Sequence, residues 1–68
     1  MTTIRLNGET EQIGVSTVAE LVAAKSDMPA GRGLAVAVNG MLVRRADWAA
    51  TPLKAGDAVE IVRAMQGG

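Results

Sequence analysis

The chain contains no cysteine, histidine, phenylalanine or tyrosine, and Trp48 is its only aromatic residue. Without cysteine no disulfide can stabilise the domain, and without cysteine and histidine the common zinc ligands are missing. The same absences remove the commonest general base and the thiol nucleophile. We therefore expect no catalytic residues and no metal site, and a protein that is not itself an enzyme.

The charge shows no surplus of either sign, because seven basic residues balance seven acidic ones. Nucleic-acid binders usually carry a basic surplus, and a single aromatic residue gives no stacking platform for bases. No apolar run approaches the ~20 residues that a membrane span needs, and the first residues lack the apolar region of a signal peptide. We expect a cytoplasmic protein that binds neither nucleic acid nor membranes.

Alternating apolar and polar residues predict short β-strands along most of the chain. Asn7-Gly8 and Asn39-Gly40 are hairpin signals, because both residue types tolerate positive φ. Residues 44–51 look less regular, and residues 54–57 look like a turn. The strands are expected at residues 3–6, 9–13, 34–38, 41–43 and 58–63.

One helix is expected after the first hairpin. Thr17-Val18-Ala19-Glu20 matches the capping box, in which Thr17 and Glu20 satisfy each other's backbone N–H groups. A loop at residues 26–32 ends the helix. The apolar side chains on one face of this helix are Val18, Leu21 and Val22.

The order of these elements predicts an α+β fold with a single core. One helix must cover one face of the sheet, and the first and last strands can lie side by side in its middle. The expected architecture is a β-grasp (ubiquitin-like) roll, a mixed sheet of four to five strands with one main helix. Residues 1–64 would form the domain and residues 65–68 a flexible tail. The apolar side chains that the helix must cover are Ile4, Leu6, Val36, Val38, Val59 and Ile61.

The other face of the sheet is a candidate partner surface. Val62 and Ala64 would point to it, and Ala35 and Ala37 join them. An apolar patch on an open sheet face often marks an interaction site, although scattered small apolar residues on a surface are also ordinary.

Three further features have simple structural interpretations. Trp48 is expected to cover an edge of the core rather than to anchor an interface. Arg44-Arg45 is expected to be a solvated turn, although it could contact an acidic partner or a phosphate. Asp57 is expected to be a turn residue before the last strand.

The sequence closes with Met65-Gln66-Gly67-Gly68. Glycine has no Cβ, so such a tail can enter the narrow channel of a partner enzyme that activates the Gly68 carboxylate, for example as an acyl-adenylate. Because the chain has no thiol, any sulfur that it carried would have to be a thiocarboxylate on Gly68. A frayed polar end without function is the simpler alternative for these residues.

Several segments together resemble the ThiS family, the sulfur carriers of bacterial thiamine biosynthesis. They are Ala35-Val36-Ala37-Val38-Asn39-Gly40, Trp48, Gly56-Asp57-Ala58-Val59-Glu60-Ile61 and Gly67-Gly68. The resemblance covers essentially the whole chain, although Arg44-Arg45 replaces the usual Pro-Arg of the family.

The resemblance implies a β-grasp fold and a carrier that binds no cofactor itself. A ThiF-type adenylating enzyme would activate the Gly68 carboxylate with ATP and magnesium. A sulfur-donating enzyme would then supply the sulfur of a thiocarboxylate, and thiazole synthase, ThiG, would receive it. Three alternatives stay open: the small subunit of molybdopterin synthase, a ubiquitin-like modifier joined to lysines through Gly68, and an interaction module whose glycines are incidental.

Overall fold

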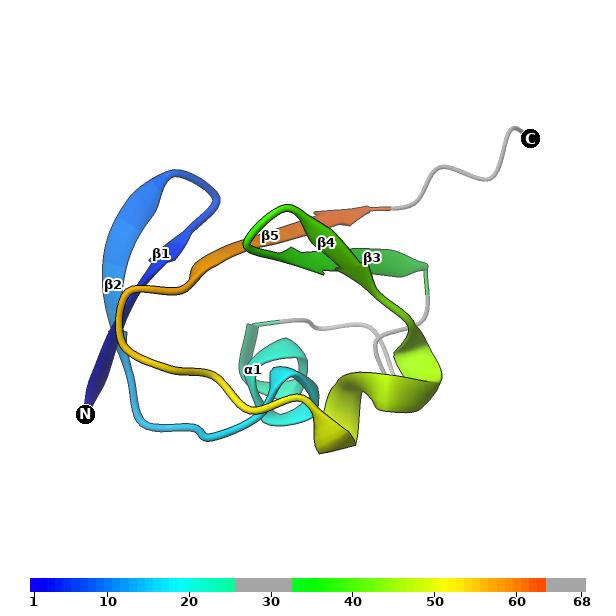
Figure 1. Ribbon diagram of the computed structural model, residues 1–68, viewed down its shortest axis with the longest axis horizontal. Helices are drawn as coiled ribbons and strands as arrows, with labels where there is room; N and C mark the ends of the chain where they lie inside the picture. Colours follow the sequence, from blue (N-terminus) through cyan, green and yellow to red (C-terminus); the bar gives the residue numbers. More distant parts are fainter. Residues whose placement is uncertain (26–32, 64–68) are drawn as a thin grey trace.

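The computed structural model describes residues 1–25 and 33–63. In this part of the chain a five-stranded sheet has the order β2-β1-β5-β3-β4, and α1 lies against one of its faces (Figure 1). The elements are β1 (Thr2–Leu6), β2 (Glu9–Ile13), α1 (Val18–Lys25), β3 (Leu34–Val38), β4 (Met41–Val43), the 3₁₀ helix η2 (Arg45–Ala50) and β5 (Ala58–Arg63). The predicted β-grasp architecture, with a mixed sheet and one main helix, is confirmed.

Two tight turns connect the hairpins β1–β2 and β3–β4. Asn7 and Gly8 have φ values of 52° and 85°, and Asn39 and Gly40 have φ values of 53° and 84°. Positive φ at both central residues is the requirement of a type I′ turn, whose twist matches that of the flanking strands. The sequence prediction of both turns is confirmed.

The last strand, β5, lies in the middle of the sheet. It pairs with β1 in parallel, where Arg5 is opposite Ala58 and Leu6 is opposite Val59. On its other side it pairs with the whole of β3 in antiparallel orientation, from Val38↔Val59 to Leu34↔Arg63. The first and last strands are therefore neighbours, as predicted.

The N-terminus of α1 has the predicted capping box. The Glu20 N–H donates to Thr17 Oγ1 at 3.2 Å, and the Thr17 N–H donates to Glu20 Oε1 at 3.3 Å. The Ser16 N–H also donates to the Glu20 carboxylate, at 2.7 Å. At the other end of the helix, Lys25 forms an ion pair with Glu11 of β2.

The core lies between the sheet and the two helical segments. The irregular segment expected at residues 44–51 is a 3₁₀ helix instead, and it brings Trp48 into the core with 5% of its surface exposed. The Trp48 Nε1–H donates to the Val43 carbonyl at 2.9 Å, which satisfies the polar atom of the ring. The prediction that Trp48 packs against the core is confirmed, whereas the expectation that one helix alone covers this face of the sheet is corrected, because η2 also covers it. The buried residues are Ile4, Ile13, Val18, Leu21, Val22, Val36, Trp48, Leu53 and Val59.

Candidate functional site

The strand β5 is the element from which the predicted tail continues. It ends at Arg63, at the same end of the sheet as the beginning of β3 (Figure 1). The candidate tail residues Met65, Gln66, Gly67 and Gly68, and the surface residue Ala64, lie outside the described residues. The described part of the site therefore consists of β5, the strands beside it, and the face of the sheet opposite α1.

Two asparagine side chains hold β5 from opposite sides. On the β1 side, the Ile61 N–H donates to Asn7 Oδ1 at 2.9 Å, and Asn7 Nδ2 donates to the Ile61 carbonyl at 3.2 Å. On the β3 side, the Ala58 N–H donates to Asn39 Oδ1 at 2.9 Å, and the Asn39 N–H donates to the Ala58 carbonyl at 2.7 Å. Both asparagines occupy the first central position of a type I′ turn, so the hairpins also anchor the central strand.

The open face of the sheet carries a small apolar patch. The register places Ala35 opposite Val62, and Ala37 opposite both Glu60 and Leu42. Cross-strand partners share a face of a sheet, and Val36 and Val59 are buried on the other face. Val62 is 55% exposed and Leu42 is 71% exposed. We call Ala35, Ala37, Leu42 and Val62 the open-face patch.

Three of the four residues in the open-face patch were expected from the sequence alone. Leu42 was missed, because a three-residue strand shows too little alternation to assign its faces. Its face follows from the hairpin register, in which the turn at residues 39–40 places Leu42 across from Ala37. That signal was present in the sequence, since a two-residue turn fixes the pairing of the strands it connects.

The remaining polar candidates have structural contacts. Asp57 accepts the Lys54 N–H at 2.8 Å and Asn39 Nδ2 at 3.0 Å, so its predicted turn role is confirmed and extended to the β3–β4 hairpin. Arg44 is exposed with extended backbone and precedes η2, whereas Arg45 is the first residue of that helix. Both side chains are exposed as predicted, but neither residue forms a turn, because Arg44 is extended and the 3₁₀ helix begins at Arg45.

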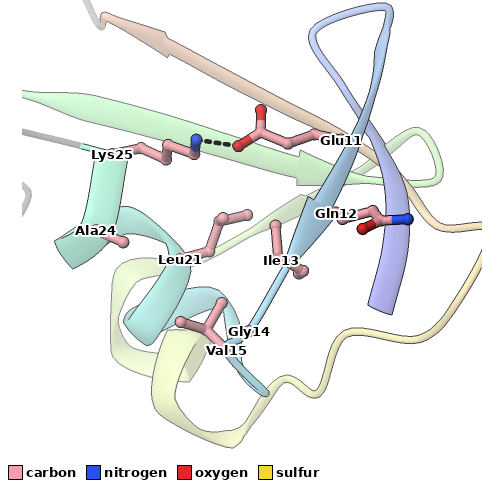
Figure 2. Close-up of a pocket in the computed structure, with 8 residues that line it drawn as sticks. All are labelled: Glu11, Gln12, Ile13, Gly14, Val15, Leu21, Ala24 and Lys25. Atoms are coloured by element: carbon pink, nitrogen blue, oxygen red, sulfur yellow. Dashed lines mark hydrogen bonds and ion pairs between the residues drawn. The ribbon is translucent and has the colours of Figure 1, made fainter. Parts of the chain in front are cut away.

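A pocket lies between β2 and α1, away from the open-face patch. Figure 2 shows the side chains of Ile13, Val15 and Leu21 at this pocket, and the Glu11–Lys25 ion pair beside it. Its volume is about 160 Å³, whereas small-molecule sites usually measure about 300–1,000 Å³. The pocket is therefore smaller than a usual small-molecule site.

Residues 1–25 and 33–63 also bear on metal binding and on membrane insertion. Within these ranges, no cluster of three or more His, Cys, Asp or Glu side chains could hold a metal ion. Within the same ranges, no helix is long and apolar enough to span a membrane.

Comparisons with known proteins agree on one family. The model of the ThiS family matches residues 4–68. The crystal structure of the thiamine biosynthesis protein ThiS from Geobacter metallireducens aligns with a TM-score of 0.81 and 31% identity, covering 98% of this chain and 100% of that one. The solution structure of a thiamine biosynthesis protein from the same organism aligns with a TM-score of 0.78 and 33% identity, covering 98% of this chain and 88% of that one. No curated protein sequence matches the chain.

Proposed function

Because this chain belongs to the ThiS family, we propose that it is the sulfur carrier of a thiamine pathway and carries sulfur as a thiocarboxylate on Gly68. The observation that supports this most directly is the extent of the family match. The match runs from residue 4 to residue 68 and so includes Gly67 and Gly68. In the described residues, the fold supplies a five-stranded sheet with one hydrophobic core ahead of this segment.

The proposed chemistry has two steps on the Gly68 carboxyl group. A carboxylate oxygen attacks the α-phosphorus of ATP in a ThiF-type enzyme that uses magnesium, and pyrophosphate leaves. A sulfur nucleophile from a sulfur-donating enzyme then attacks the acyl carbon, and AMP leaves with the oxygen that it received. With a persulfide as the sulfur nucleophile, this attack gives an acyl disulfide. A thiol then attacks the donor's own sulfur, so that the donor leaves as a disulfide and the transferred sulfur stays on Gly68. One carboxylate oxygen has then been replaced by sulfur, and the thiocarboxylate is the sulfur donor for thiazole synthase, ThiG.

Glycine suits both steps for a steric reason. Without a Cβ, Gly68 leaves the acyl carbon open to attack from either side, and glycine at position 67 can take backbone conformations that other residues disfavour. Met65 and Gln66 would extend the tail far enough to enter the partner's channel. ATP and magnesium belong to the adenylating partner in this proposal, and the carrier contributes only the reacting carboxylate.

The open-face patch is proposed as the surface that binds the partner enzymes. Leu42 and Val62 are exposed apolar side chains on neighbouring parts of one face, and Ala35 and Ala37 keep that face flat. A flat apolar centre is the part of an interface that contributes most of its binding energy. Ala64 is proposed to extend the same surface.

The proposal is tested by intact-mass analysis. The chain is incubated with ATP, magnesium, the adenylating partner and a sulfur source, and we expect a mass gain that corresponds to one oxygen replaced by one sulfur. Fragmentation should place the gain on Gly68. A competent partner that leaves the mass unchanged would contradict the proposal.

The matched control lacks only Gly68, and it should gain no sulfur while keeping the thermal unfolding of the full chain. Denaturing gels of the same mixtures test the remaining modifier hypothesis. Covalent forms of higher mass, attached to lysines, would favour conjugation over sulfur carriage.

A further inference from the structure

Asn7 closes the β1–β2 hairpin and also forms hydrogen bonds with β5. β1 ends at Leu6, opposite Val59, and the Asn7 N–H makes a further ladder bond by donating to the Val59 carbonyl at 2.9 Å. On this side of β5, the next pair of backbone groups belongs to Ile61. The Asn7 side chain meets both of them, because its carboxamide carries an acceptor and a donor as a peptide group does.

The left-handed backbone of Asn7 makes this contact compatible with the turn. Its φ of 52° is a conformation that asparagine tolerates and that most residues disfavour. The Asn7 side chain thus makes the hydrogen bonds to Ile61 that a longer β1 would make with its backbone. The bond spans 54 positions in the sequence, so it ties the N-terminal hairpin to the element that leads to the tail.

We propose that Asn7 is a positioning residue for the reaction at Gly68, an inference that rests on the proposed function. By holding Ile61 in the sheet, Asn7 fixes the point from which the residues after Arg63 enter a partner. The β3 ladder still pairs Ile61 with Val36, so without Asn7 this part of β5 is held from one side only, and the partner must order it on binding. Fixing the backbone of one residue costs roughly a tenfold factor in affinity.

Asn39 provides a matched control within the same molecule. It occupies the same turn position, has nearly the same φ, and also bonds β5 through its side chain. Its target, however, is Ala58 at the beginning of β5, where β1 also pairs with β5 through Arg5, whereas at Ile61 the β1 side of β5 is met by the Asn7 side chain. A purely structural role would make the two asparagines equivalent.

The experiment compares Asn7→Gly with Asn39→Gly. Glycine keeps the type I′ turn without strain, so only the side-chain bonds are lost. Steady-state adenylation is measured with the adenylating partner, at a temperature where both variants are folded by circular dichroism. We expect Asn7→Gly to raise the KM for the carrier about five- to tenfold with little change in kcat, and Asn39→Gly to stay within about twofold of the parent chain.

A second variant and a second measurement keep the inference testable if Asn7→Gly does not fold. Asn7→Asp retains the acceptor for the Ile61 N–H and loses the donor, so its KM should lie between those of the parent chain and Asn7→Gly. Amide hydrogen exchange should be faster at Ile61 in Asn7→Gly, closer to the parent rate at Ile61 in Asn7→Asp, and faster at Ala58 in Asn39→Gly.

Equal KM values for the Asn7→Gly and Asn39→Gly variants would overturn the inference, as would unchanged exchange at Ile61 in Asn7→Gly or a KM for Asn7→Asp equal to that of the parent chain. A parent chain that a competent partner does not adenylate would instead refute the proposed function. The exchange rate of Ile61 would still show whether Asn7 holds that residue.

Discussion

The open-face patch predicts that a single carboxylate in its centre blocks partner binding. The change is Val62→Glu, on the exposed face of the central strand β5. Complete burial of a valine side chain contributes about 1.5 kcal/mol, and Val62 is 55% exposed, so docking can gain about 0.8 kcal/mol there. A glutamate loses this gain and adds the desolvation of an unpaired charge, on the order of 2 kcal/mol at an interface.

The two terms together amount to roughly 3 kcal/mol, or about a hundredfold in Kd. The assay is isothermal titration of the carrier into the ThiF-type enzyme in the absence of ATP, so that binding is separated from chemistry. Val62→Ala, which removes only part of the apolar contact, should weaken binding about twofold to threefold.

The matched control is Ala23→Glu, which adds the same charge at an exposed position of α1, on the opposite side of the sheet. Val62→Glu also loses up to about 1 kcal/mol of β-propensity, so thermal unfolding is recorded for both variants and binding is measured well below either transition. If Val62→Glu binds the partner as tightly as Ala23→Glu does, the open-face patch is not the partner surface.

The other predictions concern the tail and the stability of the domain. Gly68→Ala should slow thiocarboxylate formation without changing thermal unfolding, because a Cβ crowds the acyl carbon; an unchanged rate by intact-mass time course would contradict the steric argument. Trp48→Phe should lower the free energy of unfolding by about 2 kcal/mol through the lost bond to Val43 and a smaller ring, as measured by urea titration; a loss under about 0.5 kcal/mol would mean that Trp48 contributes little to the core. Thr17→Ala should cost about 1 kcal/mol by removing the hydroxyl that accepts the Glu20 N–H, and an unchanged urea midpoint would show that the cap is dispensable.

Local features of the fold were predictable from short stretches of sequence. The two Asn-Gly turns require positive φ, and the structure has it at all four positions. The capping box needs only residues three positions apart, and both of its hydrogen bonds are present. Such elements depend on atoms that are close in the chain whatever the tertiary structure, so a pattern of a few residues determines them.

The 3₁₀ helix that carries Trp48 was not predictable from the local sequence. Its segment has neither a clear helical period nor an alternation, and the 3₁₀ helix there places the ring in the core. The ring is held by packing and by its bond to Val43 of β4. Burial of a large side chain outweighs weak local preference, and only the assembled core shows which segment supplies it.

The sequence by itself determined the strand order along the chain, the hairpin turns, the helix start and the chemistry available to a Gly-Gly segment without thiols. Only the tertiary structure decided which residues meet on the open face, where Leu42 joins Val62, and that the Asn7 side chain reaches Ile61. The physical reason is that these contacts join residues far apart in the chain. Their partners are set by strand register and by the packing of the whole sheet.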